Sequence, residues 1–381
     1  MRRHKNYLFI PLTVLIFSPN AAAAPPVEVR VLVAENQKTI KLTVRGDYVI
    51  RSLPSLQVLR KGGHLIEEPV SPAAAGIKLG KSEYPVRGLR IEPQNDRDLI
   101  LNRSVFRGSM DILKSGPTSL DAINRIDIES YLYGVLHHEV APWWPMEALK
   151  AQAIAARTYA YYQSKVSKSA EYDLKSSTFS QVYGGSTTER YRAKNAVNQT
   201  RGEILVYEGK VFPAYFHATC GGMTAGAKEL WKIDLRPLSG GSRCTFCRIS
   251  PHFYWEAKIP LSEIEEKMKL NGRPVGRLLK MEIITQTPSG RVGSLHITGT
   301  AGDTVMAAKD FRIWLGGDKL RSTAFTVEIE DDTANFHGKG WGHGVGLCQW
   351  GALGQSLLGH SHEKILQFYY PGSQIIPYDS Q

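Results

Sequence analysis

The alanine-rich run MEALKAQAIAARTYAYYQSKV, at positions 146–166, most constrains how this chain can fold. Alanine and long unbranched side chains favour a helix, and Pro145 precedes the run, where a first helical turn tolerates proline. Mostly small residues recur at helical spacing along one face, at Ala148, Gln152, Ala155, Ala156 and Tyr159. Such a face lets neighbouring elements approach closely. The sequence therefore predicts one long helix against which other elements pack.

The segments around this helix predict strands as well as further helices. From Val27 to about Asp127, short alternating or β-branched runs are separated by turn formers, as is typical of a β-rich region. The next segment, IESYLYGVLHHEVA, carries apolar side chains at helical spacing, and Pro142 ends it. Strands and short helices are then mixed, without the regular alternation of a doubly wound sheet. The expected fold class is therefore α+β.

The N-terminal residues are typical of an export signal. Arg2, Arg3 and Lys5 precede the apolar run YLFIPLTVLIF, which is too short to span a bilayer comfortably, and small residues follow it. We place the cleavage site near Ala23, so that residues 1–23 are a signal peptide. The alternative is an uncleaved segment that anchors the chain in the membrane. In both cases the expected location is outside the cytoplasm, in the periplasm or at the cell wall.

The charge of the chain bears on its partners. The formal net charge is +11, but the Lys and Arg residues are scattered, with no basic tail and no aromatic-rich RNA motif. Nucleic acid is therefore not an expected partner. In an exported protein this charge instead favours mild attraction to acidic polymers of the cell envelope.

The stretch HHEVAPWWP, residues 137–145, contains the first candidate for chemistry. A zinc-protease helix needs a second histidine one turn after the first, and Pro142 stands where that ligand would follow His138. Glu139 is a better candidate, because it lies in the last turn of a helix, where the backbone dipole disfavours negative charge. The tryptophans that follow can desolvate it. Both effects raise the pKa of a carboxyl toward the range of a general acid. An ordinary solvent-facing glutamate is the alternative.

The cysteines provide a candidate metal site. His217, Cys220, Cys244 and Cys247 follow an H-x2-C…C-x2-C pattern that suits a tetrahedral structural Zn²⁺ ion, with His252 as an alternative fourth ligand. Because disulfides form in exported proteins, bridges among these cysteines are an equal alternative. No cofactor is expected to be required for catalysis.

The glycine-dense loop GKGWGHGVG surrounds His343. It lacks the lysine and hydroxyl ending of a phosphate-binding loop, and its glycines instead indicate tight turns or close approach. The spacing alone leaves catalytic, substrate-binding and structural roles open for His343.

Taken in order, several segments resemble the SpoIID/LytB domain family. They include VFRGSMDIL, the stretch INRIDIESYLYGVLHHEVAPWWPMEALKAQAIAARTYAYY, SQVYGG, AVNQTRGEILVYEGKVFPAYFHATCGGMT, and GKGWGHGVGLCQWGALG with ILQFYYPG. The resemblance covers roughly residues 106–372 and is least familiar at 253–336. It implies a β-rich N-terminal region at 24–105, a catalytic domain at 106–372 with an inserted α+β portion at 253–336, and a tail at 373–381.

The resemblance implies peptidoglycan chemistry. Characterised members are lytic transglycosylases that act on glycan strands stripped of stem peptides, and the family's catalytic acid falls on Glu139. A single carboxyl suffices there, because the substrate's own C6 hydroxyl serves as the nucleophile, whereas ordinary glycosidases need two carboxyls. The zinc ligands of clostridial members lie around SQVY, where this chain has neither Cys nor His. Cys348 stands where the family usually carries serine.

Further substrate-binding candidates follow from the same resemblance: Gln152, Arg157, Gln181, Tyr183 and His343. For the first four, a buried hydrogen-bond network that holds the helices together is an equal alternative. The family also contains proteins described as amidase modifiers, so a non-catalytic glycan-binding enhancer of a cell-wall amidase is a second expected function. A zinc hydrolase built on His217 is a weaker third, because three thiolates would make a closed structural site.

Overall fold

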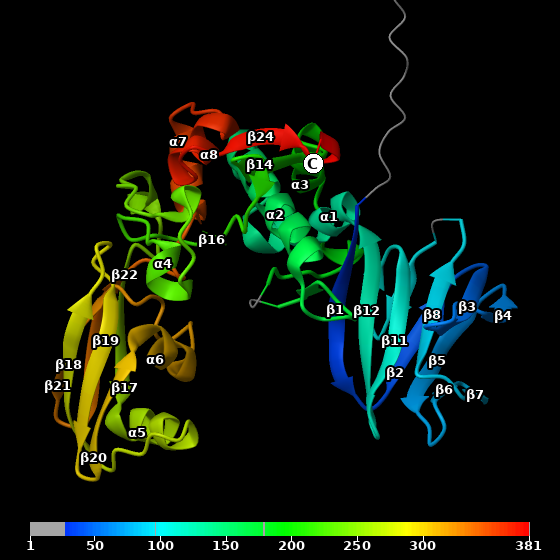
Figure 1. Cartoon of the computed structure of the whole chain (residues 1–381), viewed down its shortest axis with the longest axis horizontal. Helices are drawn as coiled ribbons and strands as arrows, with labels where there is room; N and C mark the ends of the chain where they lie inside the picture. The colour runs from blue at the N-terminus through cyan, green and yellow to red at the C-terminus, as the bar shows by residue number, and fades with distance from the viewer. Residues whose placement is uncertain (1–26, 96, 178–179, 381) are drawn as a thin grey trace, which may run out of the picture.

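The computed structural model describes residues 27–95, 97–177 and 180–380, so the expected signal peptide lies outside the described residues. Figure 1 shows three parts: a β-rich N-terminal part, a central group of helices, and a smaller part of strands and two helices on the opposite side. The mixture of several sheets with helices confirms the α+β fold class. No helix among the described residues is long and apolar enough to cross a membrane.

The N-terminal part consists of two sheets whose buried apolar side chains belong to one hydrophobic core. The larger sheet has the strand order β13 (Leu174–Lys175), β1 (Glu28–Gln37), β12 (Ser119–Asp127), β11 (Ser109–Gly116), β8 (Gly88–Pro93), β3 (Tyr48–Leu53) and β4 (Val58–Gly62). The smaller has β10 (Ser104–Phe106), β9 (Leu99–Leu101), β2 (Ile40–Val44), β5 (Leu65–Pro72), β6 (Ile77–Leu79) and β7 (Ser82–Tyr84).

The β-rich part ends later than the boundary expected from the resemblance. Strands β11 and β12 follow residue 105, yet they pair antiparallel with β8 and β1 inside the larger sheet. The division between 105 and 106 would therefore cut through one sheet, and the β-rich part continues to Asp127, as the alternating pattern predicts.

The central helices begin where the sheet ends. Helix α1 (Ile128–Glu139) starts at Asp127, whose carboxylate accepts a hydrogen bond from the Ser130 amide at 3.0 Å. Helix α2 (Met146–Val166) coincides with the predicted alanine-rich helix. Its side chains from Ala151 to Tyr161 are all buried, because five elements contact it: α1, α3 (Tyr191–Gln199), β14 (Glu203–Tyr207), α7 (Gln349–Leu357) and α8 (His362–Tyr369). Burial thus extends beyond the single face that the spacing predicts.

The C-terminal segments return to this centre. Strand β24 (Gln374–Pro377) pairs with β14 (Glu203–Tyr207), so the expected tail at 373–381 contains a strand of a sheet that also includes β15 (Lys210–Val211). Helices α7 (Gln349–Leu357) and α8 (His362–Tyr369) pack on α2. Just before α7, β23 (Leu347–Cys348) pairs in parallel with β16 (Phe216–His217). The remaining short helices are α4 (Ala227–Trp231), η1 (Ser186–Thr188), η2 (Arg236–Leu238), η3 (Phe246–Ile249) and η4 (Tyr378–Ser380).

The third part corresponds to the less familiar portion at 253–336 and has a hydrophobic core of its own. Its two sheets have the orders β17 (Tyr254–Pro260), β22 (Thr333–Lys339), β21 (Phe325–Glu330) and β18 (Leu278–Gln286), β19 (Val292–Gly299), β20 (Gly302–Ala307). Helices α5 (Leu261–Leu270) and α6 (Ala308–Leu315) contribute buried side chains to that core.

A fully buried ion pair connects α1 to α2. The Arg157 guanidinium donates to both carboxylate oxygens of Glu129, at 2.9 and 2.7 Å, and neither side chain is more than 2 % exposed. Its remaining donors bond to the carbonyls of Val197 and Glu203, both at 3.1 Å. Arg157 therefore does not line a pocket, and the alternative expectation of a buried network that holds the helices together is the correct one for this residue.

We predict that Arg157→Met destabilises the protein by about 3–5 kcal/mol, because the substitution leaves the Glu129 carboxylate buried without its partner. Urea unfolding measures the change. A matched control is Lys228→Met, which removes the exposed pair with Asp234, in which both side chains are more than 70 % exposed. That pair contributes less than about 1 kcal/mol. Equal losses in the two variants would contradict the prediction.

Candidate active site

Glu139 is the last residue of α1, and three separate segments surround its carboxyl. Val140 adopts an extended conformation immediately afterwards, which turns the chain away from the helix. One carboxyl oxygen, Oε1, accepts a hydrogen bond from the Val182 amide at 3.2 Å, and Oε2 accepts one from the Gln349 side-chain amide at 3.3 Å. The site thus brings together the end of α1, the segment after α2, and the start of α7.

Burial raises the pKa of Glu139 from its ordinary value of 4.5 to about 7, while the hydrogen bonds from Val182 and Gln349 act in the opposite direction. A raised pKa was expected from the helix end and from the two tryptophans. In the structure Trp143 is 67 % exposed, whereas Trp144 is buried and packs edge-on against Trp350. The Glu139 residue as a whole is half-buried rather than fully enclosed.

Gln181 and Tyr183 lie on either side of Val182 and are buried. Gln181 accepts a hydrogen bond from the Tyr131 hydroxyl at 3.0 Å and donates to the Ala156 carbonyl at 3.1 Å. The Tyr183 hydroxyl donates to Asn124 at 2.8 Å. Both side chains therefore belong to a buried network that fixes the Val182 amide beside Glu139, rather than to the wall of a pocket.

Gln152 and the two histidines before Glu139 make no hydrogen bond to its carboxyl among the described residues, and the rings of His137 and His138 pack against each other with centroids 5.6 Å apart. The Gln152 amide is buried and makes no hydrogen bond within the described part of the chain. His138 is exposed and His137 half-buried, and neither belongs to any group of potential metal ligands among the described residues.

His343 lies in a cluster of aromatic rings. Its Nδ1 accepts a hydrogen bond from the Val345 amide at 3.1 Å, and its ring packs edge-on against Tyr215, His217 and Trp231. Burial, together with the charges of Arg291 and Arg312, lowers the pKa of His343 to about 3. The imidazole is therefore neutral near pH 7. The glycines around it permit close packing: at Gly346, with φ +71°, a Cβ would lie 2.0 Å from the Tyr215 carbonyl oxygen.

The candidate metal site differs from its prediction in one ligand. His217 does not join the cysteines, because neither of its ring nitrogens belongs to the group of potential ligand atoms that the four sulfur atoms form; its Nδ1 lies 3.1 Å from the Val345 carbonyl oxygen. The fourth ligand atom is the sulfur of Cys348, which gathers with those of Cys220, Cys244 and Cys247. His252, the alternative ligand, instead packs against Trp341. The sequence contains only four cysteines, the number of ligands that a tetrahedral site needs, and this count could have indicated Cys348 as the fourth ligand.

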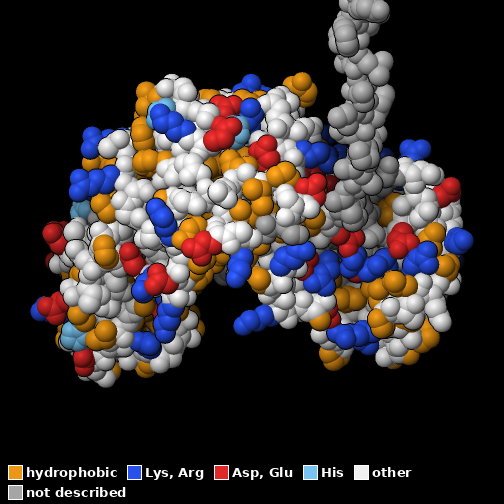
Figure 2. Space-filling model, turned by 45° about the horizontal axis from the view of Figure 1, so that its top comes forward, with side chains coloured by type: hydrophobic (Ala, Val, Ile, Leu, Met, Phe, Trp, Pro, Cys, Tyr) orange, Lys and Arg blue, Asp and Glu red, His pale blue; other side chains and the backbone are white. Residues whose placement is uncertain are grey.

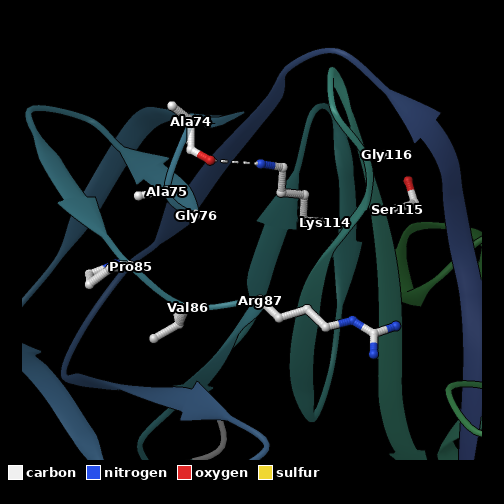
Figure 3. Close-up of a pocket in the computed structure, with 9 residues that line it drawn as sticks. All are labelled: Ala74, Ala75, Gly76, Pro85, Val86, Arg87, Lys114, Ser115 and Gly116. Carbon is white, nitrogen blue, oxygen red and sulfur yellow. Dashed lines mark hydrogen bonds between the residues drawn. The ribbon is translucent and has the colours of Figure 1, made fainter.

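A surface pocket in the β-rich part is lined by the segments 74–76, 85–87 and 114–116 (Figure 3). The Lys114 ammonium at its edge donates to the carbonyls of Ala73 and Ala74, at 2.7 and 3.4 Å. No carboxyl side chain lines this pocket, and none of the predicted site residues does. It offers no general acid.

The raised pKa of Glu139 predicts a pH-dependent stability. A carboxyl whose folded pKa lies above its unfolded value stabilises the fold fully below about pH 4.5, and this contribution is lost as pH rises through about 7. The difference corresponds to at most about 3 kcal/mol. We therefore expect Glu139→Gln to be more stable than the wild type at pH 8, with a gap that narrows toward pH 5, in urea unfolding at both pH values.

Glu147 provides the opposite case. Burial opposes its ionisation, but hydrogen bonds from His362 and Lys150 outweigh that effect and lower the pKa of Glu147 to about 2. Its stabilising effect is present above about pH 4.5 and is lost as pH falls toward 2. Glu147→Gln should therefore be less stable than the wild type at pH 8. A change of stability with the same sign in both variants at pH 8 would contradict the opposite pKa shifts of Glu139 and Glu147.

Comparisons with known proteins place this site in a family. A model for the SpoIID stage II sporulation protein matches residues 117–207, which include Glu139 and Val182. A second model, for a domain of unknown function, matches residues 247–346 and so covers the third part of the fold. Gln349 and Cys348 lie outside both matches.

Individual relatives extend the likeness over most of the chain. An uncharacterised protein of Brachyspira hyodysenteriae is 35 % identical over 307 residues, 80 % of each chain. Stage II sporulation protein D of Bacillus amyloliquefaciens is 30 % identical over 297 residues, 72 % of this chain and 83 % of the relative. The Bacillus subtilis protein called amidase enhancer is 27 % identical over 296 residues, which are 65 % of this chain and 40 % of that protein. The chain is a member of the SpoIID/LytB family.

Proposed function

We propose that this protein is a lytic transglycosylase that cleaves the bond between N-acetylmuramic acid and N-acetylglucosamine in peptidoglycan strands lacking stem peptides. The product is a strand with a 1,6-anhydro-muramic end. One observation carries the proposal: the carboxyl of Glu139, a half-buried residue at the end of α1, has a pKa of about 7 and hydrogen-bond partners that are both neutral amides. Membership of the SpoIID/LytB family supports action on the cell wall.

A carboxyl with this pKa can serve first as an acid and then as a base. In the first step protonated Glu139 donates its proton to the glycosidic oxygen while the bond from that oxygen to C1 of the muramic sugar breaks. In the second step the C6 hydroxyl forms a bond to C1 and gives its proton to the Glu139 carboxylate. The acid is thereby regenerated and no water is consumed.

The two hydrogen bonds to Glu139 suit this cycle. Between the steps Glu139 carries a negative charge, and the amides of Val182 and Gln349 both donate to its oxygens. They stabilise the anion and limit the rise of the pKa that burial causes. A mechanism with two carboxyls would instead place a second acidic side chain about 5–10 Å away across the sugar.

The charge of the protein suits strands without stem peptides. Removing the peptide leaves a free lactyl carboxylate on each muramic residue, so such a strand is polyanionic. The chain has a formal net charge of +11. Figure 2 shows Lys and Arg side chains on both sides of the hollow between the two outer parts of the molecule. Long-range attraction of this kind raises the rate of encounter with an anionic polymer.

A second candidate function is supported by one relative. The name amidase enhancer belongs to a Bacillus subtilis protein that is 27 % identical to this chain. A non-catalytic glycan-binding partner of a cell-wall amidase would use the same surface without bond cleavage by Glu139.

We predict that Glu139→Gln lowers the cleavage rate of amidase-treated glycan strands by at least about 100-fold, since the variant loses the general acid. Mass analysis of the products, with anhydro-muramic ends counted, measures the rate. Glu147→Gln is the matched control. It also removes one carboxylate, but its partners are Lys150 and His362 rather than the site, and it should retain activity.

Two outcomes would contradict the enzyme proposal. Unchanged cleavage by Glu139→Gln would exclude Glu139 as the acid. Absence of cleavage by the wild type, combined with equal acceleration of a purified amidase by the wild type and by Glu139→Gln, would support the enhancer function in its place.

A further inference from the structure

The four cysteines converge from distant parts of the chain into one buried cluster. Cys220 follows β16, Cys244 lies two residues before η3, Cys247 lies within η3, and Cys348 ends β23. Their sulfur atoms all lie within 4.8 Å of one another, and no cysteine is more than 2 % exposed. We propose that these four thiolates hold a structural zinc ion.

The spacing of the sulfur atoms suits one metal ion. Tetrahedral zinc with bonds of about 2.3 Å to sulfur places its thiolates about 3.8 Å apart. The Cys220 and Cys247 sulfur atoms are 3.4 Å apart, and the other pairs fall below 4.8 Å. Small side-chain adjustments therefore suffice to centre an ion between them. A set of four sulfur ligands in this geometry selects zinc or iron, and the redox-inert ion suits a purely structural role.

Several groups around the cluster can donate hydrogen bonds to its sulfur atoms. The Cys220 amide donates to the Cys348 sulfur at 3.2 Å, and the Gly222 amide donates to the Cys220 sulfur at 3.4 Å. The Tyr369 hydroxyl lies 3.1 Å from the Cys244 sulfur and can donate to it. Such outer partners orient metal ligands and stabilise their charge.

A buried cation balances the cluster. Zinc with four thiolates carries a net charge of −2, which is costly to bury without compensation. Arg291 is 2 % exposed and its guanidinium donates to the Cys220 carbonyl at 3.1 Å and to the Gly342 carbonyl at 3.2 Å. The third part of the fold thereby supplies a positive charge next to the cysteines.

Disulfide bridges explain the arrangement less well. Two bridges would require only that the cysteines meet in pairs, whereas here all four sulfur atoms meet at one point. Coordination by a single ion requires such a convergence.

The expected role is structural. Four protein ligands leave no open coordination position for a substrate or water. The ion would connect Cys348 to Cys247 and Cys220, which lie 101 and 128 positions earlier in the chain. The residue after Cys348 is Gln349, whose amide contacts Glu139. The cluster is thus one residue away from the candidate active site without belonging to it.

The test measures metal in the purified full chain. Elemental analysis should find one zinc per chain after treatment with EDTA. A thiol-modifying reagent should release that zinc from the wild-type protein as four thiols react. This measurement does not depend on the folding of a variant. Cys348→Ser should lose most of the zinc. His217→Gln, the matched control for the ligand set predicted from sequence, should retain it. Cobalt substituted for zinc should give a sulfur-to-cobalt absorption band that weakens in Cys348→Ser.

Other results would overturn the proposal. One such result is a purified chain without zinc, whether its thiols are free or oxidised to disulfides. A second is iron in place of zinc. A third is zinc that Cys348→Ser retains and His217→Gln loses. Metal content does not depend on glycan cleavage, so failure of the transglycosylase proposal would leave this test unaffected.

Discussion

The middle of α2, from Ala151 to Tyr161, is buried on every side, and this burial organises the structure. Along α2, alanines let α1, α3, α7, α8 and β14 approach the same axis. The consequence is a meeting of segments that are far apart in sequence. Glu139 at the end of α1 and Gln349 at the start of α7 are 210 positions apart, yet they share a hydrogen bond. Glu129 and Arg157 fix the angle between α1 and α2 from within the core.

The candidate acid results from a balance of two opposing effects. Burial alone would drive the pKa of Glu139 upward, and the two amide donors restrain it near 7. Glu147, at the first turn of α2, shows the contrasting outcome, since burial is outweighed by hydrogen bonds from His362 and Lys150 and the pKa falls to about 2. Two glutamates eight positions apart thus differ through the identity of their partners. Neutral donors leave a carboxyl able to exchange its proton near pH 7, whereas a cationic neighbour removes that ability.

The local sequence pattern was sufficient to predict the long secondary-structure elements and to single out Glu139 as the candidate acid. Composition placed α2 correctly, and alternation placed the strands up to Asp127. The local pattern did not predict features that depend on contacts with residues far away in the sequence. In the segment VFPAYFHAT only the short β15 and β16 form, because Pro213 lacks a backbone donor. Polar side chains such as Arg157 and Gln181 suit a pocket or a buried network equally well, and only the tertiary contacts decide between them. Gln349 carried no signal, because its contact with Glu139 depends on the packing of α7.

The segment GVGLCQWG connects the two proposals. Its backbone is fixed by the pairing of β23 with β16 and by glycines that place it against Tyr215. From there Cys348 points its sulfur into the cysteine cluster, while the next residue, Gln349, donates to Glu139. Serine at position 348, which the family resemblance leads one to expect, would leave the cluster with three sulfur ligands. Cysteine at this position therefore belongs with Cys220, Cys244 and Cys247 to one four-sulfur cluster. With zinc bound, the cysteine cluster would fix the start of α7. It would thereby hold Gln349, one of the two hydrogen-bond donors that limit the pKa of Glu139, in place.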